Sequence, residues 1–172
     1  MVKFVCVGLD IRTLPAARGV SADATVWEQD EYLYGYAQCE LGVAENAFQL
    51  LHPCGEMVVS DLVSLVASKN DAALVSLWLP KVVFESCQLA KWFSTPIDLS
   101  GYVLDTIGFD VCDIDGFFSY LDMISGLGST VRIFDETELM DAFAVAQAAN
   151  FVVTKHSPFV VVELKSVIVK PA

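Results

Sequence analysis

The chain has 172 residues, of which 55% are hydrophobic, and its 22 acidic against 10 basic residues give a formal net charge of −12. This charge repels phosphate and no basic cluster offsets it, which argues against direct nucleic-acid binding. The lack of a Lys/Arg-rich amphipathic face also argues against binding to a membrane surface. The longest uncharged run, 142–154, is too short for a membrane span of about 20 residues. The length suits one domain, residues 1–172, with a large core.

The cysteines and the N-terminus indicate a cytoplasmic protein. The cysteine count is odd and no C-x-x-C pair occurs, which fits reduced thiols better than a disulfide framework or a zinc site. The first apolar run is too short for the core of a signal peptide. The five cysteines are Cys6, Cys39, Cys54, Cys87 and Cys112.

The first third of the chain predicts a strand, a loop and a second strand. Residues 3–11, KFVCVGLDI, are apolar and β-branched, and a Pro/Gly/Ser-containing loop follows over 12–24. In residues 26–41 aromatic residues alternate loosely with polar ones, which indicates a strand with a bulge at Gly35. Residues 43–51 have the composition of a short helix.

The middle of the chain combines helical and buried segments. Ser60 and Asp61 are candidate caps for a helix whose apolar residues follow directly. Residues 71–79 are almost continuously apolar, so they are expected to be buried as a strand or a helix. After Pro80, residues 81–93 carry an apolar stripe at helical spacing.

The last third predicts strand, helix and strand. Residues 130–134 suggest a strand, and Asp135 with Glu138 forms a capping box that opens a helix. Residues 157–169 are apolar on both faces at first, which predicts a central or interface-forming strand. We therefore expect an α+β (mixed α/β) fold, a single-domain sandwich of a β-sheet with packed helices.

Residues 105–122, DTIGFDVCDIDGFFSYLD, carry five aspartates. With Gly116 as the sixth position of a calcium-binding loop, the first ligand position is Val111, which offers no oxygen. Asp113 and Asp115 form a D-x-D-G motif that resembles the first motif of haloacid-dehalogenase-type phosphatases. The chain lacks that family's downstream lysine and acidic pair, so neither motif is complete.

The histidines give no complete motif either. His52 lies in HPCGE, which does not match the zinc deaminase signature. A pair of Cys54 or Cys112 with His156 stays open, because such dyads form in space rather than in sequence. We expect no catalytic residue, no metal site and no cofactor.

An acidic surface interleaved with aromatic residues is the remaining interpretation. Residues 98–141 contain ten carboxylates and a single basic residue, Arg132. Such a surface attracts a basic partner, and aromatic side chains can anchor it. The predicted partner-binding residues are Asp105, Asp110, Asp113, Asp115, Phe117, Phe118, Tyr120 and Asp122.

Residues 107–122, IGFDVCDIDGFFSYLD, resemble short stretches of immunity proteins from bacterial contact-dependent growth inhibition and other polymorphic toxin systems. The resemblance implies an acidic cytosolic protein without catalytic motifs that inhibits a cognate toxin, a nuclease being the expected activity. A small carboxylate-dependent enzyme, with or without a divalent cation, is the alternative. High hydropathy would also suit a homo-oligomeric adaptor.

Overall fold

The computed structural model describes residues 2–13, 31–41, 44–45, 50–52, 56–86, 97–114, 120, 133–152 and 158–171. In these residues, six strands form one antiparallel sheet in the order β2-β3-β1-β4-β6-β5. The strands are β1 (Phe4–Thr13), β2 (Ala44–Glu45), β3 (Leu51–His52), β4 (Ala72–Pro80), β5 (Tyr102–Asp113) and β6 (Phe159–Val169). The helices are α1 (Glu31–Glu40), α2 (Glu56–Ala67), α3 (Lys81–Ser86) and α5 (Leu139–Val152). The predicted α+β class is confirmed.

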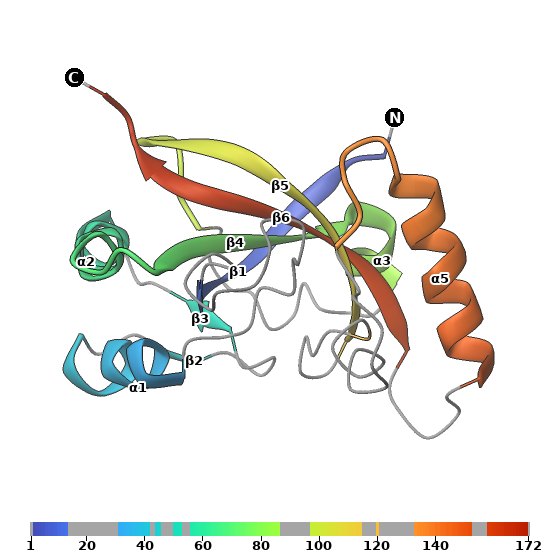
Figure 1. The fold of residues 1–172 in the computed structure, drawn as a ribbon, viewed down its shortest axis with the longest axis horizontal. Coiled ribbons are helices and arrows are strands. Elements are labelled where there is room, and N and C mark those ends of the chain that lie inside the picture. The colour runs from blue at the N-terminus through green and yellow to red at the C-terminus, as the bar shows by residue number, and fades with distance from the viewer. Residues whose placement is uncertain are drawn as a thin grey trace.

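The four long strands twist strongly across the molecule (Figure 1). β1 pairs with β4 along its whole length, with one bulge between Cys6 and Gly8. β6 lies between β4 and β5, which confirms the predicted central strand. Its pairing with β4 extends only to Val75↔Ser166, whereas its pairing with β5 continues to Val169. The ends of β5 and β6 therefore separate from β4, as Figure 1 shows beside α2.

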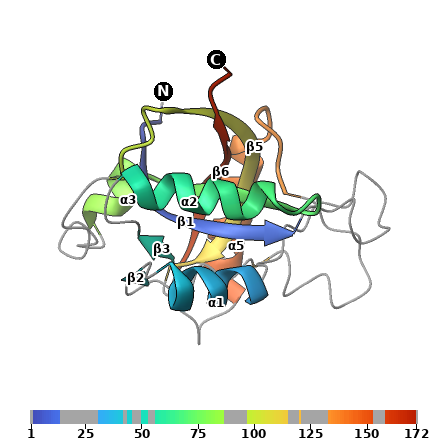
Figure 2. The same ribbon diagram turned by 90° about the vertical axis from the view of Figure 1, so that its left-hand side faces the viewer.

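Helices cover both ends of one face of the sheet. Val167 packs in a core cluster with residues of α1 and α2, and Val161 packs in a cluster with the inner face of α5. Because these valines are an even number of residues apart on β6, they point to the same face. Figures 1 and 2 show α1 and α2 at one end of the sheet and α5 at the other. Val75 and Leu77 point to the opposite face and pack with Phe84 of α3.

Several sequence predictions agree with these elements. β1, β4 and β6 fall on the three segments predicted as strand or buried, and α5 follows the predicted cap. The amide of Asp135 donates to Oε2 of Glu138 (2.9 Å), and Oδ1 of Asp135 accepts from the amide of Thr137 (2.8 Å). The reciprocal bonds satisfy amides in the turn that precedes α5, which begins at Leu139, three residues after the predicted start.

The prediction of a strand over 26–41 is wrong for the described part, which forms α1. Leu33 and Ala37 are buried and Tyr32 and Tyr36 are exposed, so the aromatic pattern has helical spacing. Gly35 lies inside the helix with no neighbouring atom near the position of a Cβ. The short helix expected over 43–51 is also wrong where the structure describes it, because β2 and β3 lie there.

The cap predicted at Ser60 and Asp61 is wrong as well, because α2 begins at Glu56 and contains both residues. Both side chains lie on the exposed side of α2, whereas Leu62 and Val66 are buried. Polar residues on the solvent side of an amphipathic helix can be mistaken for its start.

Candidate partner-binding surface

Those predicted partner-binding residues that the structure describes do not lie together on one exposed surface. Asp105 is exposed on β5, whereas Asp110 and Asp113 are buried, with 1% and 9% of their surface accessible. Tyr120 is half-buried and packs edge-on against Phe159, with ring centroids 5.0 Å apart. The remaining predicted residues lie outside the described part of the chain: Asp115, Phe117, Phe118 and Asp122.

Asp110 must be corrected from a docking residue to a member of a buried polar cluster. Its Oδ1 accepts the amide of Val111 (2.7 Å), and Oδ1 of Asp10 accepts the amide of Ile11 (2.8 Å) in the same local arrangement on β1. Nε of Arg12 donates to Oδ2 of Asp10 (2.9 Å). Burial alone would lower the pKa of Arg12, but Asp10, with a smaller contribution from Asp110, raises it above its ordinary value. These carboxylates face a buried cation and not solvent.

Asp113 needs the same correction, since it is the last residue of β5 and pairs with Phe159 at the start of β6. A buried carboxylate cannot present its charge to a partner without a change of structure. Asp105 is thus the one described aspartate of the predicted set that offers an exposed charge.

The buried Cys112 and the half-buried Cys6, both in the sheet, have poorly reactive thiols. Burial first, and the nearby Asp110 second, raise the pKa of Cys112 well above its ordinary value. Burial also raises the pKa of Cys6 to about 12. A nucleophilic thiol needs a lowered pKa, so Cys112 is a poor candidate for the Cys/His dyad left open by the sequence. Cys54 and His156 lie outside the described residues.

The incomplete metal motifs gain no support from the fold. Val111 and Asp113 belong to a continuous strand, β5, and not to a loop between two helices. Among the residues that the structure describes, no group of three or more His, Cys, Asp or Glu side chains is placed to hold a metal ion.

β5 is an edge strand whose two halves differ. At Gly108 a register shift and a φ of +150° interrupt the strand, and the added Cβ of any other residue would meet the carbonyl oxygen of Phe134. Directly beyond it, Phe109 and Phe134 exchange two backbone hydrogen bonds of 2.7 and 2.8 Å, which cover the outer edge. Over residues 103–107, by contrast, β5 pairs with β6 alone within the described chain. We call residues 103–107 the β5 edge.

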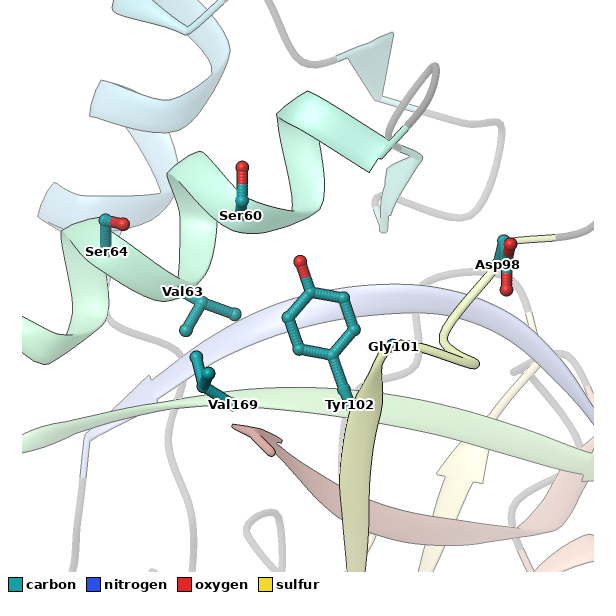
Figure 3. A pocket seen from close by; sticks show the side chains of 7 residues that line it. All are labelled: Ser60, Val63, Ser64, Asp98, Gly101, Tyr102 and Val169. Carbon is teal, nitrogen blue, oxygen red and sulfur yellow. The ribbon is translucent and has the colours of Figure 1, made fainter. Parts of the chain in front are cut away.

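A groove adjoins the start of β5, between this strand and α2 (Figure 3). It has a volume of about 490 Å³ and is lined by Ser60, Val63, Ser64, Asp98, Gly101, Tyr102 and Val169. Figure 3 shows the ring of Tyr102 directed toward α2 and the side chains of Val63 and Val169 directed toward each other. Asp98 lies at the other side, where the amide of Ser100 donates to its Oδ1 (2.9 Å). That hydrogen bond lowers the pKa of the exposed Asp98 carboxyl, which favours its charged form.

A second groove, of about 550 Å³, continues from the first because both are lined by Val63 and Val169. It lies where β6 separates from β4, and apolar residues dominate its lining. Ile168 and Val169 expose 46% and 59% of their surface beside it. Its residues are Val63, Val66, Ala67, Lys69, Ala72, Ala73, Leu74, Ser166, Val167, Ile168 and Val169. Two joined apolar grooves beside an open strand edge could accept apolar side chains of an extended segment.

The sequence analysis missed a polar cluster on the central strands. Nζ of Lys165 lies 4.8 Å from the ring centre of Trp78 and 3.2 Å from Oε1 of Glu163. Nε1 of Trp78 donates to Oγ of Ser76 (2.9 Å), which donates to the carbonyl oxygen of Lys165 (3.1 Å). Polar residues two apart inside apolar strands were the available signal. The cluster satisfies polar groups in the sheet and links β4 to β6.

The comparisons with known proteins found no family model, no curated protein and no solved structure that matches this chain. Within the described residues, no helix has the length and apolar character needed to cross a membrane. Functional inference therefore depends on the chemistry of this chain alone.

Proposed function

We propose that this is an acidic cytoplasmic binding protein that neutralises a basic protein partner, an immunity protein that inhibits a cognate toxin, in particular a nuclease. The carrying observation is the open β5 edge, which displays the exposed Asp105 on one face of the sheet and adjoins, on the other face, an apolar groove bordered by Asp98. It belongs to a chain of net charge −12. The proposal keeps Asp105 of the predicted set, which runs from 105 to 122, and centres docking on the start of β5.

Charge supports a basic partner. Proteins that act on nucleic acid carry Lys/Arg-rich clefts, and an inhibitor of such a cleft needs exposed carboxylates that attract it over a distance. The resemblance of residues 107–122 to immunity proteins of polymorphic toxin systems favours this class of partner.

The geometry supports a mode of docking. An extended segment of the partner adds to the β5 edge through backbone hydrogen bonds, and its basic side chains approach Asp98 and Asp105. Apolar side chains of the partner enter the groove between Tyr102, Val63 and Val169. Such anchors supply most of the affinity in protein interfaces, while charge sets the rate of encounter.

The experiment begins with the polypeptide encoded immediately upstream of this chain, purified as an inactive variant. Stopped-flow association should slow as salt rises, because exposed charges are screened beyond about 8–10 Å at physiological ionic strength. The double reversal Asp98→Lys/Asp105→Lys should lower the association rate about tenfold or more, in line with typical electrostatic steering. Glu40→Lys/Glu85→Lys changes the net charge equally at exposed sites of α1 and α3 and is the matched control. Equal effects of both pairs would contradict docking at the β5 edge.

Hydrogen exchange tests the backbone contact separately. Partner binding should slow exchange of amides within residues 103–107, because an added strand protects them. The amide of Phe109 already donates to Phe134 and should change little. A partner that binds tightly without protecting 103–107 would show that another surface is used.

A further inference from the structure

The outer face of α5 carries an apolar stripe. Met140 and Phe151 expose 73% and 88% of their surface, and Ala144, Gln147 and Ala148 lie exposed between them at helical spacing. A surface helix normally turns a charged or polar face to solvent, and an apolar outer face indicates a site that another surface covers. We call these five residues the α5 stripe.

The α5 stripe sits on a helix that the fold holds firmly. On its inner face, Ala142, Ala146 and Ala149 are buried against β5 and β6. Near its C-terminal end, Nδ2 of Asn150 donates to the carbonyl oxygen of Phe159 (2.8 Å), and Oδ1 accepts the amide of the same residue (2.6 Å). With the cap at the other end, these bonds fix the helix to the sheet. The stripe is therefore a preformed surface and needs no rearrangement to meet a partner.

We infer that the α5 stripe pairs with the α5 stripe of a second copy of this chain, the two helices running antiparallel about a twofold axis. In that register Met140 of one copy lies opposite Phe151 of the other, and Ala144 lies opposite Gln147. The apolar pair at each end, and the short Ala144 opposite the longer Gln147 in the middle, make the stripe complementary to itself, as a twofold interface requires. The short side chains of Ala144 and Ala148 allow the helix axes to approach to about 8–10 Å.

Charge favours a second copy over other occupants. Residues 142–154 contain no charged side chain, so a basic protein would find no carboxylate to pair with along most of the stripe. A membrane surface would normally require Lys or Arg beside the apolar residues, and the helix has neither. Two copies of a chain with net charge −12 repel each other over most of their surface. Within the described part of the chain, the α5 stripe is an uncharged surface at which they can meet with little repulsion.

The available area sets the strength of this pairing. An exposed phenylalanine offers on the order of 150–200 Å², so two stripes would bury roughly 800–1,000 Å² in total. That size lies at the low end for specific interfaces and predicts a weak, reversible dimer rather than an obligate one.

Sedimentation equilibrium over a range of protein concentrations tests the inference. The weight-average mass should rise from that of one chain, 18.7 kDa, toward twice that value as concentration increases. Higher salt should strengthen the association, because it screens the repulsion between copies while leaving the apolar contact intact. The opposite salt dependence is expected for the basic partner, so the two proposals fail independently.

Phe151→Asp should weaken self-association at least tenfold and leave the circular dichroism spectrum unchanged, since Phe151 is almost fully exposed. Val82→Asp is the matched control: Val82 is 70% exposed on α3, and its change adds the same charge. A wild-type protein that stays at 18.7 kDa at all concentrations and salt conditions would overturn the inference. Equal weakening of self-association by Phe151→Asp and Val82→Asp would also overturn it. The same holds if Phe151→Asp changes binding of the basic partner and leaves self-association unchanged.

Discussion

Replacement of Arg12 by methionine should destabilise the protein strongly while keeping most of the side chain's length. Arg12 is only 5% exposed, and its Nε lies 2.9 Å from Oδ2 of Asp10, which is 2% exposed. The change removes the buried cation and leaves the carboxylates of Asp10 and Asp110 in the same apolar surroundings. Loss of one member of a buried ion pair typically costs about 3–5 kcal/mol. For a chain of this size that corresponds to a fall in Tm of roughly 6–20 °C.

Urea unfolding followed by circular dichroism gives the free energy of unfolding for Arg12→Met, Asp10→Asn and the double variant. The double variant should be more stable than the sum of the single losses predicts, by about 0.5–3 kcal/mol, because the two residues interact directly. A loss below about 1 kcal/mol for Arg12→Met would match a solvated pair and would refute the assigned burial.

Gly108→Ala should lower the free energy of unfolding by about 2–4 kcal/mol, because the positive φ of Gly108 and the nearby carbonyl oxygen of Phe134 disfavour a side chain. Gly101→Ala is the control and should cause little loss, because the space around Gly101 is open. Equal losses for the two variants in chemical unfolding would contradict this reasoning. Asn150→Ala should lower the free energy of unfolding by about 1–3 kcal/mol, because it removes the two hydrogen bonds to the backbone of Phe159. An unchanged Tm would argue against these hydrogen bonds. The exposed Cys39 should react with a thiol reagent much faster than Cys6, as single cysteine-to-serine variants can show. Because the pKa of Cys6 is raised from 9.0 to about 12, its neutral thiol contributes stability below pH 9 that is lost as pH rises toward 12, by roughly 4 kcal/mol in total. Cys6→Ala should reduce this loss of stability between pH 9 and 12. The same dependence of stability on alkaline pH in the variant and the wild type would refute the raised pKa of Cys6.

Patterning predicted the elements in which one signal dominates. β4 is a nearly continuous apolar run and β6 begins as one, because both are covered there on two faces. The capping box of Asp135 and Glu138 forms as predicted, since it depends on a few neighbouring residues, although α5 begins only at Leu139. α1 was mistaken for a strand because Tyr32 and Tyr36, its aromatic residues on the solvent side, imitate the alternation of a strand. Local sequence alone does not show which aromatic residues are exposed.

The site was less predictable because it depends on which face of a strand each residue occupies. A bulge reverses the alternation of faces along a strand, and β5 contains one at Gly108. Asp105 and Asp110 lie on either side of it and pair with Ser166 and Val162 of β6, which are four residues apart, so both aspartates point to the same face of the sheet. Counting residues places them on opposite faces, and it could not show that one is exposed and the other buried on a shared face. The partner of the buried cluster, Arg12, comes from β1, which no local motif connects to β5.

The two proposals together account for the unusual composition, acidic and apolar at once, by assigning separate roles to separate surfaces. Part of the acidity, Asp10 and Asp110, is buried with Arg12 and contributes nothing to attraction at a distance. The exposed carboxylates beside the β5 edge can steer a basic partner, while the uncharged α5 stripe can meet only an apolar surface. Salt screens the attraction between the exposed carboxylates and a basic partner, and it also screens the repulsion between two copies of the chain. A salt titration should therefore weaken binding of the partner and strengthen self-association. Parallel movement of both would mean that one surface serves both partners, and the division of roles proposed for β5 and α5 would then be wrong.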